Sequence, residues 1–253
     1  MPLPPYWLVM PAAGRGERLG AGLPKQYLTL LGRPMLEWSL APFLADADCR
    51  GVVVAVAAGD IHWPDVRARL SRPVREATGG ATRADSVASG LAALRTARAD
   101  DDDWVLVHDA ARPCITPAEI DALRAAVAAD PRASGGILAV PLADTLKRGD
   151  AAHGALRSEG TLPRESLWRA LTPQMFRLGA LRQALAAAAR DGRNPTDEAQ
   201  AIEWQGVAPR LVSGEATNLK VTTQADVVLA ETILAARPQA LRAAVAAGAG
   251  GRT

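Results

Sequence analysis

Tyr6-Trp7-Leu8-Val9-Met10 is a short run of large apolar residues, and the small residues of Pro11-Ala12-Ala13-Gly14-Arg15-Gly16 follow it directly. A short apolar run that ends at a proline is typical of a strand buried on both faces of a sheet. Small residues after such a strand let the backbone approach a ligand closely, so that successive N–H groups can point at phosphate oxygens. The two segments together predict a buried strand that leads into an anion-binding loop.

Two cationic side chains, Arg18 and Lys25, follow this loop at a spacing that lets both reach phosphates lying on it. The loop lacks the GxxxxGK[ST] pattern of a P-loop. Leu19 stands where the dinucleotide-binding pattern GxGxxG needs a glycine, which removes the main support for a dehydrogenase. A glycine-rich turn that carries surface charges is the alternative for this segment by itself.

Lysine is scarce in this chain, because only Lys25, Lys147 and Lys220 are lysines among the 29 basic residues. Arginine therefore supplies most of the ordinary positive charge. Each lysine is a candidate for a site that needs a compact ammonium group rather than a planar guanidinium.

The rest of the chain alternates between apolar runs and helical patterns. Further strands are predicted at residues 51–58, 104–107 and 136–140. Helices are predicted at residues 34–44, 85–94, 116–127, 178–189, from 196 onward and at 227–236. This alternation predicts an α/β fold with a doubly wound, mostly parallel sheet, in which ligands bind beyond the carboxyl ends of the strands.

Residues 142–171 break this rhythm. The segment has no helical stripe and alternates only weakly, so we expect an extended hairpin-like arm. A long insertion without regular structure is uncommon unless it has a role, and packing on another subunit is the role we expect. We expect residues 1–253 to form a single domain with this inserted arm and a flexible tail after about residue 238.

Composition excludes several classes of protein. With 49% hydrophobic and 22% charged residues, the chain can bury a sizeable core and is too polar for a membrane protein. Its 29 basic and 27 acidic residues nearly balance, which argues against a general nucleic-acid binder. Cys49 and Cys114 are far apart, which excludes a disulfide scaffold and a structural zinc site. We expect a cytoplasmic protein without nucleic-acid or membrane partners.

Seven motifs, taken in order along almost the whole chain, resemble the family of 2-C-methyl-D-erythritol 4-phosphate cytidylyltransferases. The motifs are Pro11 to Leu19 with Pro24-Lys25-Gln26-Tyr27, Gly79-Gly80 with Arg83-Ala84-Asp85-Ser86-Val87, Val107-His108-Asp109-Ala110-Ala111-Arg112-Pro113, Asp144-Thr145-Leu146-Lys147, Leu171-Thr172-Pro173-Gln174, Thr196-Asp197-Glu198-Ala199 and Asn218-Leu219-Lys220-Val221-Thr222. One such motif would be weak evidence, whereas seven in register are strong.

The resemblance implies a Rossmann-like fold of the nucleotidyltransferase type, with an extended β-hairpin arm that forms a homodimer. It also implies transfer of CMP from CTP to 2-C-methyl-D-erythritol 4-phosphate. The products would be 4-diphosphocytidyl-2-C-methyl-D-erythritol and pyrophosphate, a step of the non-mevalonate route to isoprenoid precursors. Mg²⁺ is the implied cofactor, held mainly by the phosphates of CTP.

The resemblance also implies roles for individual residues. Arg18 and Lys25 would stabilise the transition state, and Asp109 could in addition contact the metal. The implied nucleotide-binding residues are Pro11, Ala12, Ala13, Gly14, Gly16, Gly80, Ser86, Asp109 and Ala110. The implied polyol-phosphate contacts are Asp109, Arg112, Thr145, Arg164, Thr172, Thr196 and Lys220. Ala81 departs from the family, which commonly has an aspartate after the second glycine.

Two residues near the expected site have plainer interpretations. Alternation along the strand points His108 away from Asp109, so we expect a packed histidine rather than a base. Cys114 has no histidine partner in the pattern, so we expect it to pack as a small apolar residue. Two other functions remain open: a cytidylyltransferase that acts on ribitol 5-phosphate, and a non-catalytic nucleotide-binding protein on the same fold.

Overall fold

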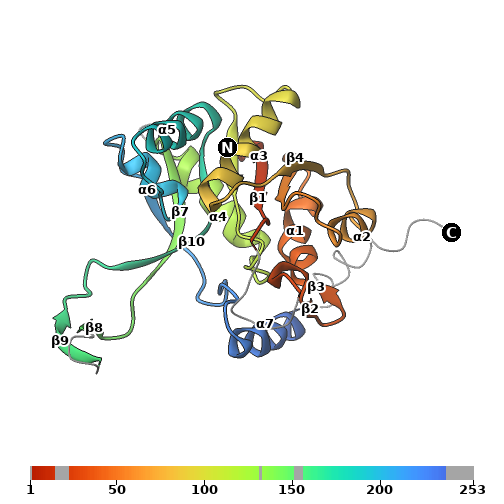
Figure 1. The fold of residues 1–253 in the computed structure, drawn as a ribbon. Helices are drawn as coiled ribbons and strands as arrows, with labels where there is room; N and C mark the ends of the chain where they lie inside the picture. The colour runs from red at the N-terminus through yellow and green to blue at the C-terminus, as the bar shows by residue number, and fades with distance from the viewer. Residues whose placement is uncertain (1, 15–22, 131–132, 151–155, 238–253) are drawn as a thin grey trace.

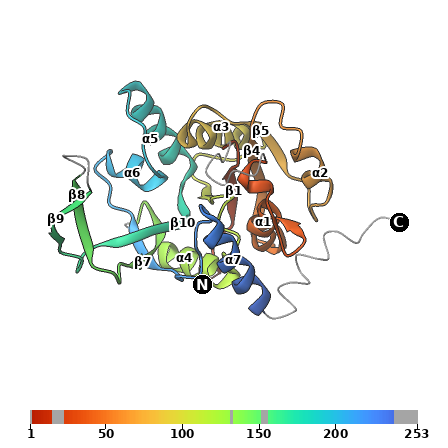
Figure 2. The same cartoon turned by 60° about the horizontal axis from the view of Figure 1, so that its bottom comes forward.

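Strand β1 (Tyr6–Pro11) lies inside a seven-stranded sheet. The structure is a computed structural model, and it describes residues 2–14, 23–130, 133–150 and 156–237. The strand order is β11-β7-β10-β6-β1-β4-β5. The other strands are β4 (Cys49–Val56), β5 (Arg75–Thr78), β6 (Trp104–Val107), β7 (Gly135–Pro141), β10 (Trp168–Arg177) and β11 (Arg210–Ser213). Helices cover both faces of this sheet (Figures 1 and 2).

The pairing of the strands confirms the predicted fold class. β1 runs parallel to β4 and to β6, and Leu8 lies opposite Val52 on one side and Leu106 on the other. β5 and β11 also pair in parallel with their neighbours, whereas β10 is antiparallel to both β6 and β7. The sheet is therefore mostly parallel, with one reversed strand that the sequence did not predict.

The predicted helices are all present, with boundaries close to those expected. They are α1 (Met35–Ala45), α3 (Arg83–Thr96), α4 (Pro117–Ala128), α5 (Leu178–Arg190), α6 (Glu198–Glu203) and α7 (Gln224–Ala236). The short helix α2 (Trp63–Ala68) is an addition. Thr116 caps α4 and Thr223 caps α7, each through a reciprocal capping box. Thr82 caps α3 in the same way.

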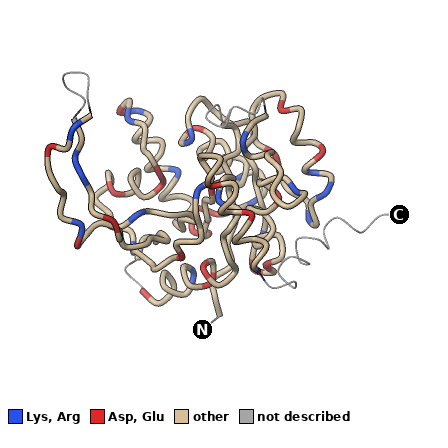
Figure 3. Tube along the Cα trace, turned by 90° about the horizontal axis from the view of Figure 1, so that it is seen from below, with Lys and Arg blue, Asp and Glu red and all other residues tan. Residues whose placement is uncertain are grey.

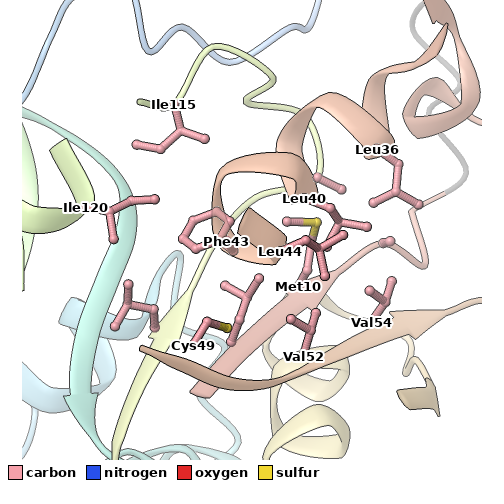
Figure 4. Close-up of a cluster of buried hydrophobic side chains, with 14 of the residues drawn as sticks. Met10, Leu36, Leu40, Phe43, Leu44, Cys49, Val52, Val54, Ile115 and Ile120 are labelled. Atoms are coloured by element: carbon pink, nitrogen blue, oxygen red, sulfur yellow. The ribbon is translucent and has the colours of Figure 1, made fainter. Parts of the chain in front are cut away.

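Strand β1 contributes to a hydrophobic core on each face of the sheet, because successive side chains point to opposite faces. Leu8 and Met10 pack in the core beneath α1 and α4, where Phe43 of α1 is fully buried (Figure 4). Val9 faces the opposite core, which contains apolar residues of α3, α5 and α6. Both faces are thus covered, as the continuous apolar run predicted.

A third, smaller cluster joins α7 to the segment that follows the first loop. Leu30, Met35 and Trp38 pack there with Val227 and Leu234 of α7. Leu30 belongs to a two-stranded sheet of β2 (Thr29–Leu30) and β3 (Arg33–Pro34). Leu28, which packs against this cluster, directly follows the short 3-10 helix η2 (Lys25–Tyr27), which carries one of the predicted catalytic residues.

The arm is a two-stranded antiparallel hairpin of β8 (Leu146–Asp150) and β9 (Arg157–Leu162). It projects from the ends of β7 and β10, away from β1 and β4 (Figures 1 and 2). The predicted range of 142–171 extends too far, because residues 168–171 already belong to β10 and pair with β7. The boundary between the arm and β10 was missed because apolar and polar residues alternate only weakly on both sides of it. The predicted flexible tail, residues 238–253, lies outside the described residues.

Basic residues and acidic residues are both spread along the chain trace (Figure 3). None of the helices within the described residues is long and apolar enough to span a bilayer.

Candidate active site

The loops that follow β1, β5 and β6 meet at the carboxyl edge of the sheet and surround a cavity of about 250 Å³. This is the place where ligands bind in open α/β sheets. The cavity is lined by many of the residues that the family resemblance selected: Pro11, Ala12, Ala13, Gly14, Lys25, Gly80, Ser86, Asp109, Ala110 and Lys220. Residues that are up to 209 positions apart in the chain, from Pro11 to Lys220, thus share one wall.

Close packing explains the small residues of the first loop. The amide of Ala12 donates to the carbonyl of Ala55 at 2.7 Å, and the buried Gln26 donates to the carbonyl of Ala12, also at 2.7 Å. A Cβ atom at Gly79 would lie 2.3 Å from the Cβ of Ala13, which is impossible without a shift of one loop. Small residues are therefore needed on both loops where they touch.

The second loop is held in shape by Ser86. Its hydroxyl accepts a hydrogen bond from the amide of Gly80 at 3.1 Å and donates one to the carbonyl of Thr82 at 3.0 Å. A Cβ atom at Gly80 would lie 2.2 Å from the Cβ of Asp85. Ser86 thus fixes the backbone of residues 80–82, which line the cavity. Ala81 also lines the cavity, where its methyl group offers no charge or hydrogen bond.

Asp109, at the end of β6, carries the negative charge of the cavity and is only 6% exposed. Its Oδ1 accepts from Nε of Arg83 at 2.9 Å, and its Oδ2 lies 2.8 Å from Nζ of Lys220. Burial alone would raise the pKa of this carboxyl, but the charges of Arg83, Lys220 and Arg112 outweigh it and hold the pKa well below its usual range. Asp109 is therefore an ionised acceptor at neutral pH.

Arg83 and Glu198 complete this charge cluster, and sequence reasoning did not assign a role to either. The guanidinium of Arg83 makes a bidentate pair with Glu198, with N–O distances of 2.6 and 3.0 Å. Glu198 is the first residue of α6 and is 1% exposed. Both residues lie inside quoted motifs, so the motifs pointed to them, but a pair 115 positions apart was not visible in the sequence.

His108 is a packed histidine, as predicted. It is fully buried; Nε2 lies 3.2 Å from the carbonyl of Arg112 and Nδ1 lies 3.0 Å from the hydroxyl of Thr172. Burial lowers the pKa of His108 to about 4, although the nearby carboxylate of Asp109 opposes this effect. The neutral ring accepts from Thr172, whose hydroxyl in turn accepts from the amide of Asp109 at 3.0 Å. His108 therefore helps to fix the backbone amide of Asp109 through the hydroxyl of Thr172.

Several predicted polyol contacts lie away from the cavity wall. Arg112 is buried beside Asp109, and it donates to the carbonyls of Asn218 at 2.8 Å and Ala170 at 3.4 Å. The hydroxyl of Thr172 hydrogen-bonds to the ring of His108 and to the amide of Asp109. The remaining three are exposed: Thr196 just before α6, and Thr145 and Arg164 on the arm, where Arg164 donates to the carbonyl of Ala143. Gly16 and Arg18 lie outside the described residues.

Asp109 does not fit a divalent cation in this geometry. Each of its oxygens already accepts from a cationic side chain, and a third cation, Arg112, lies 3.7 Å from Oδ2. Within the described ranges, no three His, Cys, Asp or Glu side chains are gathered closely enough to hold a metal ion. The protein wall therefore supplies positive rather than negative charge to whatever binds here.

The chain is similar to known proteins both in its sequence and in its fold. The family model described as "IspD: 2-C-methyl-D-erythritol 4-phosphate cytidylyltransferase" matches residues 6–236. The 2-C-methyl-D-erythritol 4-phosphate cytidylyltransferase of Pseudomonas aeruginosa strain UCBPP-PA14 is 52% identical over 226 residues, which cover 89% of this chain and 94% of the relative.

Two solved structures share the fold over nearly their whole length. A 4-diphosphocytidyl-2C-methyl-D-erythritol synthase superposes with a TM-score of 0.78 at 36% identity, covering 91% of this chain and 99% of its own. The IspD of Francisella tularensis gives a TM-score of 0.77 at 32% identity, with 90% and 99% coverage. With the family model matched from the first strand to the last helix, this chain belongs to the IspD family, the 2-C-methyl-D-erythritol 4-phosphate cytidylyltransferases.

Proposed function

We propose that this protein transfers CMP from CTP to 2-C-methyl-D-erythritol 4-phosphate and releases pyrophosphate. Membership of the family supports this activity, and one observation within the chain carries it. The cavity combines a wall of small residues with cationic groups, Lys25 and Lys220, around Asp109, the one carboxylate among the described residues that line it. A nucleoside triphosphate and a phosphorylated polyol are both anions that such a wall attracts.

In the proposed reaction a hydroxyl of the polyol attacks the α-phosphorus of CTP, a P–O bond forms, and the bond to pyrophosphate breaks. Negative charge grows on the phosphate oxygens and on the leaving group, so fixed cations lower the barrier most. Lys25 lies in η2 at the cavity, and Arg18 follows the same loop in the sequence. We assign transition-state stabilisation to these two side chains.

Neither Asp109 in the cavity nor the buried His108 next to it is suited to act as a strong general base. His108 is fully buried and is engaged by Arg112 and Thr172 on its two nitrogens. The pKa of Asp109 is held below its usual range, so its carboxylate binds protons weakly. Catalysis is therefore assigned to orientation and charge stabilisation, with Asp109 as a hydrogen-bond acceptor for the ribose or the polyol.

The polyol phosphate is assigned to the side of the cavity where Lys220 lies. The side chain of Lys220 is 40% exposed, so its ammonium can contact a phosphate while it remains near Asp109. Arg112 is buried beside Asp109, with its Nε 3.7 Å from Oδ2, and is retained as a proposed contact from the family pattern. Thr172 and Thr196 flank the same region in the family pattern and are retained as proposed contacts.

We propose Mg²⁺ as the cofactor, bound by the phosphates of CTP and water rather than by Asp109. Mg²⁺ keeps much of its oxygen shell from substrate and solvent, so it does not need a protein cage. When bound, the ion would neutralise phosphate charge. The cationic side chains Arg83 and Lys220 beside Asp109 support binding of Mg²⁺ by the phosphates, because they would repel a metal ion placed at Asp109 itself.

We further propose a homodimer in which the arm reaches the partner's cavity, with Thr145 and Arg164 acting there. The arm projects away from β1 and β4 (Figures 1 and 2), and the loop after β1 lines the cavity of its own chain. The arm and its base expose apolar side chains, since Leu156 beside β9 is 79% and Trp168 at the start of β10 is 41% accessible. A cytoplasmic location is also proposed, and the unpaired thiols of Cys49 and Cys114 suit a reducing compartment.

Pyrophosphate release tests the reaction directly. CTP and Mg²⁺ are offered with 2-C-methyl-D-erythritol 4-phosphate or with ribitol 5-phosphate in parallel, and rapid release with the first alone is the expected result. Release with ribitol 5-phosphate alone would reassign the polyol. No release with either, despite CTP binding, would favour a non-catalytic nucleotide-binding protein. EDTA should abolish the activity and added Mg²⁺ should restore it; activity that survives chelation would remove the metal from the proposal.

A further inference from the structure

Arg83 links three parts of the molecule that are distant in sequence. It is the first residue of α3 and directly follows the loop of Gly80, Ala81 and Thr82 at the cavity wall. Its Nε donates to Oδ1 of Asp109 at the end of β6, and its two terminal nitrogens donate to Glu198 at the start of α6. One side chain thus connects the nucleotide loop, the central carboxylate and the helix that follows Thr196.

This arrangement requires an arginine. Three N–H groups are donated to two separate carboxylates, which only a planar guanidinium with two usable edges can do. The carboxylates of Asp109 and Glu198 are 8% and 1% exposed, whereas Arg83 is 25% exposed. Burial raises the pKa of the Glu198 carboxyl, and the charge of Arg83 opposes that shift. Without Arg83, the buried carboxyl group of Glu198 would lose the cation that it pairs with, and Asp109 would keep only Lys220 and Arg112 as counter-charges.

The two oxygens of Asp109 have different partners. Oδ1 is held by Arg83, which Glu198 fixes in turn, whereas Oδ2 is paired with Lys220, whose side chain is 40% exposed. An exposed lysine can turn toward an incoming phosphate at little cost, whereas a bidentate arginine cannot move without breaking its other pair. Substrate can therefore displace the partner of Oδ2 but not the partner of Oδ1.

We propose that Arg83 is a positioning residue: Glu198 anchors it, and it holds Oδ1 of Asp109 so that Oδ2 is the oxygen offered to the substrate. The inference rests on the proposed function, because it takes Asp109 to face the nucleotide and the polyol. It also explains how the nucleotide loop and α6 keep a fixed relation, since both are tied to the same guanidinium.

A paired apolar replacement separates positioning from mere stability. Arg83→Met alone leaves the buried Glu198 uncompensated and Oδ1 of Asp109 without its partner, so the melting temperature and kcat should both fall. Arg83→Met with Glu198→Leu removes both ends of the buried pair, and such replacements are often neutral for stability. The double variant should therefore melt near the wild-type temperature but keep a kcat lowered by about 10²-fold, because Asp109 has lost its guide. Recovery of wild-type kcat in the double variant would overturn the proposal.

Carboxyl carbon NMR of Asp109 gives a readout that needs no turnover. Its pKa should rise by about 1–3 units in the double variant, because an opposite charge in contact has been removed. An unchanged Asp109 titration would overturn the proposal even if activity falls. If the wild-type protein releases no pyrophosphate with either polyol, the proposed function fails, while this titration still decides the role of Arg83.

Two further variants complete the design. Arg83→Lys keeps a positive charge but cannot donate to both carboxylates, and it serves if the double variant does not fold. A kcat about 10-fold below wild type is expected for it, and a wild-type kcat would count against the proposal. Arg95→Met is the matched control, because Arg95 lies on the same helix and its pair with Asp101 is exposed on both sides. It should leave kcat, melting temperature and the Asp109 titration unchanged.

Discussion

The cavity wall and the arm are built in opposite ways. At the cavity Ala12, Ser86 and Gln26 are each 3% exposed, and hydrogen bonds hold the backbone at Ala12 and at Gly80. On the arm the residues of β9 are exposed along most of the strand, and the hairpin is held by its own cross-strand pairs, such as Lys147 with Thr161 at 2.6 Å. The described part of the first region is packed within the chain, whereas the second region is largely exposed.

This difference has a physical meaning. A two-stranded hairpin in water is marginally stable without a surface to cover it. The nucleotide site needs only the packing of one chain, whereas residues on the arm acquire a fixed position only when something covers them. The proposed second subunit supplies that cover. Substitutions at the cavity should therefore act within each chain, and substitutions on the arm should depend on the partner.

Loss of Lys25 should give the largest effect. Lys25→Ala is expected to lower kcat by about 10²-fold or more, because a cation that meets developing charge is removed, while the Kd of CTP changes much less. Arg18→Ala should behave in the same way. Steady-state pyrophosphate release and calorimetric CTP binding measure the two quantities. If Lys25→Ala only raises the KM for CTP, Lys25 is a binding residue and leaves the catalytic pair.

The arm is tested by complementation between subunits. Arg164→Ala should lower activity by about 10- to 10²-fold, since a charged hydrogen bond to phosphate is lost. Co-expression of Lys25→Ala and Arg164→Ala chains with different tags yields mixed dimers. If Arg164 acts across the interface, one site carries both defects and the other carries neither, so activity returns. Continued inactivity of the purified mixed dimer would place Arg164 in its own chain's site.

Two glycine substitutions compare the packing of the regions directly. Gly79→Ala puts a Cβ atom 2.3 Å from Ala13 and should destabilise the protein by about 1–3 kcal/mol, with a raised KM for CTP. Gly160→Ala on the arm has no atom within 4 Å of the added methyl and should change stability by less than about 0.5 kcal/mol. Urea unfolding provides the comparison. Equal effects at the two positions would contradict the difference in packing.

The smallest expected effect is a pH dependence that originates behind the cavity. Because burial lowers the pKa of His108 to about 4, the unfolded chain, with an imidazole pKa near 6.5, binds more protons than the folded one between these values. His108 should therefore contribute about 1 kcal/mol less stability at pH 5.5 than at pH 7. His108→Gln should flatten this part of the stability curve, measured by denaturant unfolding. Glu198, whose pKa burial raises, is present in both proteins and cancels in the comparison.

Much of this fold and site could be read from local patterns. The apolar run at residues 6–10, the small residues after it and the capping boxes at Thr116 and Thr223 each specify structure through neighbours a few positions away. They led to the correct fold class and to the loop at the cavity, whereas the family and the other residues around the cavity came from the resemblance of the seven motifs. These features are local because backbone conformation, helix capping and the period of side-chain burial depend on short segments.

Only the tertiary structure decided which distant side chains meet. The reversed strand β10 was missed because its sequence resembles the end of the arm, and its antiparallel place depends on β6 and β7 on either side. The pair of Arg83 and Glu198 was missed because each reads as an ordinary first-turn charge. Thr172 was predicted as a substrate contact, yet its hydroxyl joins His108 to the amide of Asp109. Each of these contacts joins segments that are distant in sequence. Whether two such side chains are buried together depends on how the strands and helices pack around the sheet, so no single segment determines it.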